Sequence, residues 1–351
     1  MFRKVCTALL GVLAMLLAAE LLLRALPVST ATKTGYYLDP VISTYPPGHA
    51  WQVATGWDLR NSRRLTANNL GFVAAGDFVP DPQAIGLIGD SYVEAGMLDL
   101  AERPAAQLAA ALLPPRPVYA LGAPGSALLD YAERIRFASE HLGLHDFVVL
   151  MEAGDVRQSL CGSGNVHGPC LDRDSLQART ELLPGPSLVK RVLREFALAQ
   201  YMVGQLKFDG ARLIKQALAG EAHGEPVASP GQQTDTAAEQ TRRAAMVNAV
   251  TEQFFSRITR FATGRLVFVI DGRRSRAALQ DDAVALTPLM RERAAFIELA
   301  RRHGAEVIDA EVFYRQHWAR SSLGLSVSPS DGHLNRIGVG LLMRATAESL
   351  R

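Results

Sequence analysis

The chain has 351 residues, of which 48% are hydrophobic, and its formal net charge is +2. This length allows one domain of about 250–300 residues or two unequal domains, each with a packed core. Because the charge is nearly balanced, a strongly basic surface for nucleic acid or another polyanion is not expected.

An apolar segment lies at the very start of the chain. Residues 5–26 read VCTALLGVLAMLLAAELLLRAL and follow two basic residues. Basic residues before an apolar run favour a cytoplasmic N-terminus and an exported body. Two interpretations are open: an uncleaved signal anchor over residues 1–31, or a signal peptide cleaved near Ser29-Thr30-Ala31. We favour the anchor, because Glu20 and Arg24 are poorly placed before a cleavage site.

The three cysteines fall into two groups. Cys6 lies in the apolar run, whereas Cys161 and Cys170 bracket the loop CGSGNVHGPC. A short loop closed by two cysteines is typical of a disulfide in an oxidising compartment. A metal site with His167 as third ligand is an alternative, but no second Cys or His pair nearby completes a tetrahedral set, so no metal is expected. Two free thiols are the third alternative.

Apolar runs alternate with helix-like segments after an irregular, Gly- and Pro-containing lead-in over residues 32–80. Five runs have the character of buried strands: 85–88, 118–121, 147–151, 266–270 and 306–308. Helical patterns stand between them. This alternation predicts a parallel sheet covered by helices, with right-handed crossovers, in a domain over residues 81–351.

A long block over about residues 171–263 separates the third and fourth predicted strands. We expect residues 171–218 to be mostly helical and residues 219–237 to form a polar linker, with a further helix near 238–263. We interpret the block as a helical insertion within the sheet domain.

Ser91 is a candidate nucleophile at the end of the first predicted strand, in the sequence IGDSYVEAG. Ligands of open parallel α/β sheets bind beyond the carboxyl ends of the strands, where this serine is expected. A serine in such a place is also a good helix N-cap, and on the local sequence alone that structural role is the simpler interpretation.

The C-terminal sequence SPSDGHLNRIGVG contains candidate partners for this serine. We expect His333 in a loop just before a helix that Asn335 caps. Asp331 stands two residues earlier, close enough to bind one ring nitrogen and leave the other for a serine proton. A lone histidine in a loop is more often a solvated surface residue, so the neighbouring aspartate is the feature that favours catalysis.

Four segments resemble the SGNH/GDSL hydrolases, in particular membrane-anchored bacterial members. These segments are Asn68-Asn69-Leu70-Gly71-Phe72, Gly89-Asp90-Ser91, Ala120-Leu121-Gly122-Ala123-Pro124-Gly125 and Asp331-Gly332-His333-Leu334-Asn335. The resemblance covers roughly residues 5–160 and 264–351. It implies the SGNH hydrolase fold, a flavodoxin-like three-layer α/β/α sandwich with a central parallel sheet, here with an N-terminal transmembrane helix and the helical insertion.

The resemblance also implies functional residues. Ser91, His333 and Asp331 would form a catalytic triad, and the backbone N–H groups of Ser91 and Gly125 would bind the oxyanion. Two positions depart from the family pattern. Gly154 stands where the family has an asparagine that donates to the oxyanion, and the loss of one such donor typically lowers turnover about 10²–10³-fold. Many relatives place the acid three residues before the histidine, where this chain has Ser330.

Three polar residues are candidates for a substitute oxyanion donor: Arg157, Gln158 and Asn165. Without one, the enzyme would be slow or inactive. The resemblance implies a serine esterase without cofactors that hydrolyses acyl esters, which we expect to be O-acetyl esters on envelope carbohydrate. An O-acyltransferase working with polysaccharide-modification machinery and a non-catalytic glycan-binding protein stay open. The expected location is the bacterial inner membrane, as a single-pass protein with its catalytic domain in the periplasm.

Overall fold

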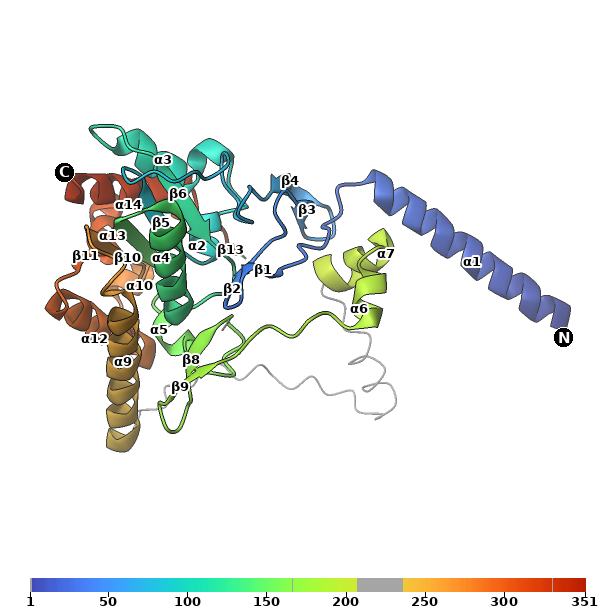
Figure 1. The fold of residues 1–351 in the computed structure, drawn as a ribbon. Coiled ribbons are helices and arrows are strands. Elements are labelled where there is room, and N and C mark those ends of the chain that lie inside the picture. Colours follow the sequence, from blue (N-terminus) through green and yellow to red (C-terminus); the bar gives the residue numbers. More distant parts are fainter. Residues whose placement is uncertain (1, 166, 207–235, 330) are drawn as a thin grey trace. The chain divides into compact units, whose positions relative to one another are not determined.

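The computed structural model describes residues 2–165, 167–206, 236–329 and 331–351, and the chain divides into two compact units (Figure 1). The anchor unit contains Met1–Lys33, Ala50–Thr66 and Pro184–Thr234. The sheet unit contains Thr34–His49, Ala67–Leu183 and Asp235–Arg351. The predicted boundaries 1–31, 32–80 and 81–351 stay a prediction.

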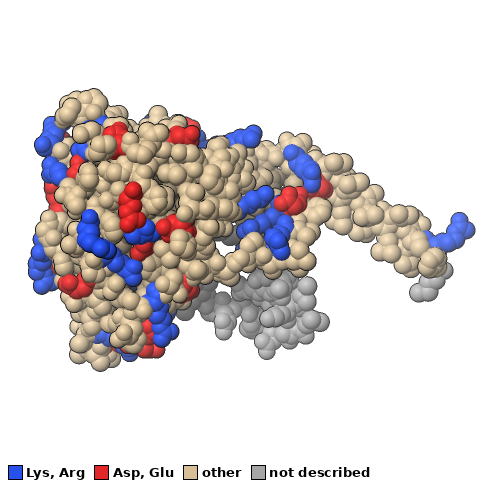
Figure 2. Space-filling model, in the orientation of Figure 1, with Lys and Arg blue, Asp and Glu red and all other residues tan. Residues whose placement is uncertain are grey.

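The anchor unit begins with helix α1 (Phe2–Ala25), which contains an 18-residue stretch with a mean hydropathy of 2.3 and has no buried residue. Figure 2 shows it free of charge along most of its length, with basic side chains near its N-terminal end. Its 24 residues are enough to cross the hydrocarbon core of a bilayer. A signal sequence meets the same criteria, so retention of this helix as an anchor stays a prediction.

The rest of the anchor unit consists of a hairpin and short helical segments. Their bounds are β3 (Ala50–Thr55), β4 (Arg60–Thr66), α6 (Leu188–Leu193), α7 (Ala197–Ala199) and the π-helical turn η2 (Gln200–Gln205). Glu20 in α1 accepts hydrogen bonds from the backbone N–H groups of Ala197 (3.0 Å) and Leu198 (2.9 Å) and from Arg24 (2.7 Å). Its carboxylate therefore satisfies free N–H groups at the start of α7.

The sheet unit is built on five parallel strands in the order β11-β10-β7-β5-β6. Their bounds are β5 (Ile85–Gly89), β6 (Val118–Gly122), β7 (Asp146–Met151), β10 (Leu266–Ile270) and β11 (Glu306–Asp309). All five predicted strands are confirmed. Numbered by their own succession, the order is 2-1-3-4-5, which is the flavodoxin-like arrangement.

Helices cover both faces of this sheet and make three layers (Figure 1). Successive strand residues alternate between two cores: Val149 and Met151 face one, whereas Val148 and Leu150 face the other. The first core is covered by α4 (Leu128–Leu142), α9 (Ala237–Ile258) and α12 (Pro288–Arg302). The second is covered by α3 (Pro104–Ala111), α13 (Ala310–Trp318) and α14 (Arg336–Ser349). The predicted three-layer α/β/α fold is confirmed.

Short elements complete the sheet unit. They are β1 (Gly35–Asp39), β2 (Ile42–Thr44), α2 (Ser91–Glu94), η1 (Leu100–Glu102), α5 (Asp155–Gln158), β8 (Pro169–Leu171), β9 (Ala178–Thr180), α10 (Arg276–Gln280), α11 (Asp282–Ala285), β12 (Ser326–Ser328) and β13 (Asp331–Leu334). The lead-in is not irregular throughout, because β1 pairs with β2 and β3 pairs with β4. Short hairpins are held by cross-strand hydrogen bonds and need no long apolar pattern.

The start of the expected helical block is wrong. Residues 171–180 contain the antiparallel hairpin β8–β9. The carboxylate of Asp172 accepts the backbone N–H groups of Asp174 (3.2 Å) and Ser175 (3.0 Å), which closes the turn of the hairpin. The predicted polar linker lies outside the described residues up to residue 235. The helix α9 that follows packs between α4 and α12 and belongs to the core of the sheet unit.

Candidate active site

Ser91 is the first residue of α2, directly beyond the carboxyl end of β5. The turn between them is tight: a Cβ atom at Gly89 would lie 2.6 Å from Val93 Cγ2. Asp90 is the N-cap of α2 and accepts the backbone N–H of Tyr92 at 2.8 Å. The capping role considered for Ser91 is therefore held by Asp90, and the serine hydroxyl is left for other partners.

His333 lies beside this serine. Its Nε2 atom is 2.9 Å from Ser91 Oγ, and its Nδ1 atom is 2.6 Å from Asp331 Oδ1. The same carboxylate oxygen accepts the backbone N–H of His333 at 3.1 Å. The side chains of His333 and Asp331 are 31% and 27% exposed, so a ligand can reach them. The three residues proposed from the sequence are brought together in one hydrogen-bonded chain.

A short antiparallel pair holds the histidine, which the sequence analysis placed in a loop. Strand β13 pairs with β12 through Leu334 and Ser326 and through Asp331 and Ser328. Immediately afterwards, Asn335 caps α14 by accepting the backbone N–H groups of its first turn, at 2.9 and 3.1 Å. The predicted N-cap is confirmed, and the histidine is fixed between a strand pair and a helix start.

The segment at residues 68–72 supports α2 from a distance. Asn68 Oδ1 accepts the backbone N–H groups of Leu70 and Phe72, both at 3.0 Å. The carbonyl of Gly71 accepts the backbone N–H of Tyr45 at 3.0 Å, and the Tyr45 hydroxyl donates to Glu94 Oε2 in α2 at 2.7 Å. Residues 68–72 therefore help to position α2, the helix that begins with Ser91.

Tyr92 and Arg274 form the wall next to the imidazole, and the sequence analysis missed both. The ring centroids of Tyr92 and His333 are 5.2 Å apart, and the Arg274 guanidinium lies 5.0 Å from the Tyr92 centroid. Arg274 forms an ion pair with Asp271 and contacts the Tyr92 hydroxyl, while Tyr314 donates to Asp271 at 2.6 Å. The position of Asp271 directly after β10 was the available signal, because strand ends of this kind border the site.

Burial raises the pKa values of carboxyl groups near Ser91. Burial, with a smaller effect of the nearby charge of Glu152, raises the pKa of Asp90 to about 6. Burial also raises the pKa of Glu94 to about 7, against the hydrogen bond from Tyr45. Burial raises the pKa of the Tyr92 hydroxyl far above its ordinary value, so this group stays neutral.

Two backbone N–H groups are candidates for binding an oxyanion. Within the described residues, the N–H groups of Ser91 and Gly125 donate no hydrogen bond to the protein. Gly125 has φ = +69°, a left-handed conformation that favours glycine. Both residues follow neighbouring strands, since β5 and β6 pair in register through Gly89 and Gly122.

The side-chain amide of Gln158 lies next to Gly154, the position of the absent asparagine. A Cβ atom at Gly154 would lie 3.0 Å from the Nε2 atom of Gln158. Arg157, a second candidate donor, is bound to the buried Glu292 through two hydrogen bonds of 2.9 and 2.8 Å. Its guanidinium is therefore committed to an ion pair. Asn165, the third candidate, lies at Gly125, with its Oδ1 atom 3.7 Å from the position of a Cβ there.

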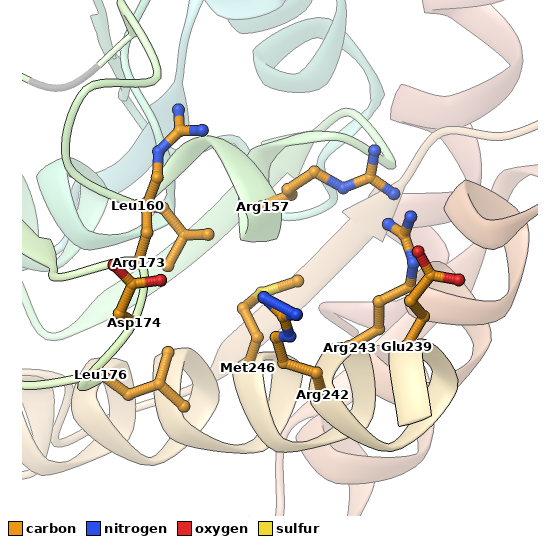
Figure 3. Close-up of a pocket in the computed structure, with 9 residues that line it drawn as sticks. All are labelled: Arg157, Leu160, Arg173, Asp174, Leu176, Glu239, Arg242, Arg243 and Met246. Atoms are coloured by element: carbon orange, nitrogen blue, oxygen red, sulfur yellow. The ribbon is translucent and has the colours of Figure 1, made fainter. Parts of the chain in front are cut away.

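A cavity of about 360 Å³ opens at the ends of β7 and β10. Its polar lining comes from Glu152, Arg157, Gln158 and Asp271. The rest of the lining consists of Ala153, Gly154, Gly272, Leu289 and Met290. A second cavity, of about 270 Å³, is lined by four arginines, Arg157, Arg173, Arg242 and Arg243, together with Asp174 and Glu239 (Figure 3). Arg157 and Arg243 both bind Glu292, so much of the positive charge in this second cavity is neutralised.

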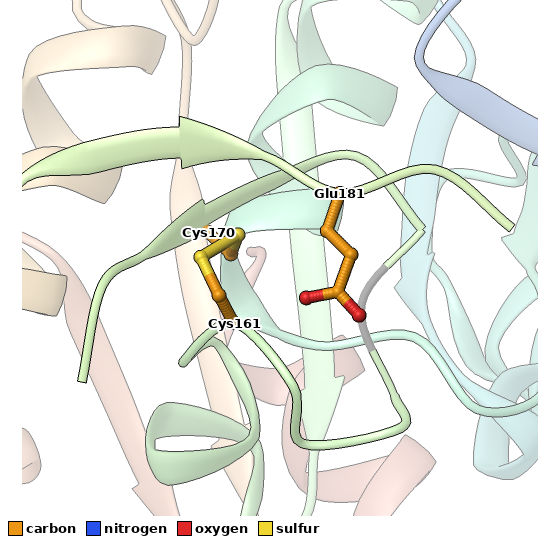
Figure 4. A group of neighbouring side chains, drawn as sticks. All are labelled: Cys161, Cys170 and Glu181. Carbon is orange, nitrogen blue, oxygen red and sulfur yellow. A yellow bond between two sulfur atoms is a disulfide. The ribbon is translucent and has the colours of Figure 1, made fainter.

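The predicted disulfide between Cys161 and Cys170 is present, and Glu181 lies beside it (Figure 4). The three side chains have the spacing of metal ligands, but sulfur atoms bonded to each other are not thiolates. The Glu181 carboxylate instead accepts the backbone N–H of Gly162 at 2.5 Å. The cluster closes the loop 161–170, and His167 of that loop lies at Gly125.

No protein-family model and no curated protein matches the sequence. Solved structures of SGNH/GDSL-type hydrolases and carbohydrate acetylesterases align with most of the chain. A carbohydrate acetylesterase from Sinorhizobium meliloti is 10% identical, with 76% of this chain and 98% of that chain covered and a TM-score of 0.36. An acetylxylan esterase from Geobacillus stearothermophilus, present as a catalytic mutant, is 11% identical, with 78% of this chain and 95% of that chain covered and a TM-score of 0.41.

A member of the lipolytic protein G-D-S-L family from Veillonella parvula is 11% identical, with 76% and 97% of the two chains covered and a TM-score of 0.35. Identities and TM-scores are low throughout.

Proposed function

We propose that this protein is a serine esterase in which Ser91 is the nucleophile, His333 the general base and Asp331 the residue that orients the imidazole. The observation that carries the proposal is the hydrogen-bonded chain from Ser91 Oγ through both ring nitrogens of His333 to Asp331 Oδ1, at 2.9 and 2.6 Å. It stands at the carboxyl edge of a parallel sheet, where such folds bind ligands.

The reaction follows from these contacts. His333 Nε2 takes the hydroxyl proton as Ser91 Oγ attacks the ester carbonyl, and a tetrahedral adduct with a negatively charged oxygen forms. The imidazolium returns the proton to the leaving alkoxide, and the acyl group stays on Ser91. Water then attacks the acyl-enzyme by the same route and releases the acid. Asp331 stabilises the imidazolium in both steps.

The proposed oxyanion donors are the backbone N–H groups of Ser91 and Gly125. Both are unused by other described parts of the protein, so they can donate to a developing charge without breaking an existing bond. Because residue 154 is a glycine, the asparagine side chain that is the third oxyanion donor in SGNH/GDSL hydrolases is missing at this position.

The proposed substrate is an O-acetyl ester on carbohydrate of the cell envelope. The cavity of about 360 Å³ at the strand ends carries carboxylate and amide groups that can form hydrogen bonds with sugar hydroxyls, beside the apolar side chains of Leu289 and Met290. The disulfide and the apolar helix α1 support a location outside the cytoplasm, with the sheet unit in the periplasm.

The test uses the full chain in detergent with a fluorogenic acetyl ester and with an O-acetylated glycan. We expect Ser91→Ala and His333→Ala to remove turnover, while Ser256→Ala, at an exposed serine on α9, keeps the parent rate. Acetate release that is equal in parent and Ser91→Ala proteins would exclude the proposed mechanism.

Gly154 favours one further function, glycan binding without turnover. In that case the folded parent would bind acetylated glycan with no release of acetate, and Ser91→Ala would bind equally well. An increase in acyl transfer when a deacetylated glycan acceptor is added would instead identify an O-acyltransferase, which uses the same serine chemistry with a sugar hydroxyl in place of water.

A further inference from the structure

The disulfide-closed loop 161–170 brings two polar side chains to Gly125. His167 Nε2 lies 3.9 Å and Asn165 Oδ1 lies 3.7 Å from the position that a Cβ atom of Gly125 would take. Because Gly125 has no side chain, these groups face its backbone directly. Both groups therefore lie next to the residue whose N–H is proposed to bind the oxyanion.

One buried carboxylate clamps both segments. Asp130 Oδ2 accepts the backbone N–H of Ala127, two residues after Gly125, at 2.9 Å. Asp130 Oδ1 accepts the backbone N–H of His167 at 3.2 Å, and the His167 carbonyl accepts the hydroxyl of Tyr36 at 2.6 Å. The histidine is thus held at both its N–H and its C=O, at a fixed distance from the Gly125 turn.

His167 is only 6% exposed, and its imidazole carries no charge near neutral pH, since burial and the nearby Arg134 lower its pKa to about 4. Its Nδ1 atom is buried and has no hydrogen-bond partner among the described residues. A neutral imidazole has one N–H group, and a buried N–H without an acceptor is costly. The proton is therefore better placed on Nε2, the nitrogen that faces Gly125.

We propose that His167 is a catalytic residue whose Nε2–H donates a hydrogen bond to the oxyanion, in place of the asparagine absent at Gly154. This inference rests on the proposed esterase function. The donor adds no proton transfer: the N–H stays on His167 while the carbonyl oxygen gains and loses its negative charge. The disulfide between Cys161 and Cys170 sets the position of the donor by closing its loop.

The test compares His167→Leu with His167→Gln, because glutamine restores an N–H donor of similar reach. We expect His167→Leu to lower kcat about 10²–10³-fold with little change in KM, and His167→Gln to recover part of that loss. His145→Leu, at an exposed histidine, is the matched control and should keep the parent kcat. Circular dichroism and Tm establish that each variant folds.

A second readout separates donation from a purely structural role. An alkylboronic acid forms a tetrahedral adduct with a reactive serine and places an oxygen in the oxyanion position. We expect His167→Leu to weaken inhibition by the boronic acid by the factor lost in kcat/KM, since both report binding of the tetrahedral state. If KM rises and the ratio of the boronic acid inhibition constant to KM stays unchanged, His167 only supports the fold.

The loop can be tested independently of the histidine. Cys161→Ser together with Cys170→Ser should lower kcat, and adding His167→Leu to this pair should lower it little further, because both changes remove the same donor. Turnover that depends on Ser91 but is unaffected by His167→Leu would overturn the inference and leave the esterase function standing. A loss confined to Gln158→Ala would also overturn it, because Gln158 would then be the donor. If the parent shows no turnover that depends on Ser91, both the role of His167 and the esterase function are overturned.

Discussion

The Nε2 atom of His333 lies 2.9 Å from the Oγ atom of Ser91, although 242 residues separate them in the chain. Ser91 begins α2 after the strand β5, and His333 lies in β13 just before α14. Neither residue belongs to the other's local structure. Their approach therefore depends on packing of α14 against the same face of the sheet that α2 adjoins.

Asp331→Asn tests the role of the acid. An amide cannot stabilise the imidazolium and can bind the wrong ring tautomer, so we expect kcat to fall by up to about 10⁴-fold while some activity remains. The pH–rate profile should show the same loss across neutral pH. Asp174→Asn, at an exposed aspartate, should leave kcat unchanged. An Asp331→Asn protein with parent activity would remove this residue from the proposed mechanism.

Arg274→Ala tests the wall behind the imidazole. The change leaves the carboxylate of Asp271, which is 5% exposed, without its cation, so we expect a loss of about 3–5 kcal/mol in the free energy of unfolding. Urea unfolding measures it. Adding Asp271→Asn should recover part of the loss, and Arg320→Ala at the surface serves as control. Equal stability of Arg274→Ala and parent would show that the ion pair is unimportant.

The raised pKa of Glu94 predicts that the free energy of unfolding depends on pH in a specific way. Its pKa is raised from 4.5 to about 7, so between these values the folded state binds more protons than the unfolded state. The contribution of Glu94 to stability therefore falls as pH rises from about 4.5 to about 7 and is then constant. Glu94→Gln should remove this component and flatten the profile relative to the parent. Glu140→Gln, at a partly exposed glutamate, should leave the profile unchanged.

Loss of the disulfide is expected to lower stability. Cys161 and Cys170 are 9 residues apart, and closing a loop of this size contributes about 2–3 kcal/mol in the chain-entropy model. The double serine variant should melt at a lower Tm than the parent, and a reducing agent should lower the Tm of the parent but not that of the double serine variant. Cys6→Ser should melt as the parent does. A parent Tm that does not respond to reduction would contradict the expectation.

The amino-acid sequence alone predicted all five strands of the sheet. Strands buried on both faces are continuous apolar runs, such as 147–151 and 266–270, and this pattern is visible without any knowledge of their neighbours. The candidate serine and histidine were visible for a similar reason. One follows a strand end, and the other stands two residues from an aspartate, so each has its signal in the local sequence.

Contacts between distant segments were decided only by the tertiary structure. The sheet order places β5 between β6 and β7, which brings the turn of Gly125 and the residues after β7 to the two sides of Ser91's strand. The clamp of Asp130 on His167 and the packing of Arg274 on Tyr92 likewise join segments far apart in the chain. Such contacts follow from helix and sheet packing, which leaves no periodic trace in the segments that it brings together. The chain therefore reveals its strands and its reactive side chains locally, whereas the surroundings that decide what those side chains can do arise only when the layers pack.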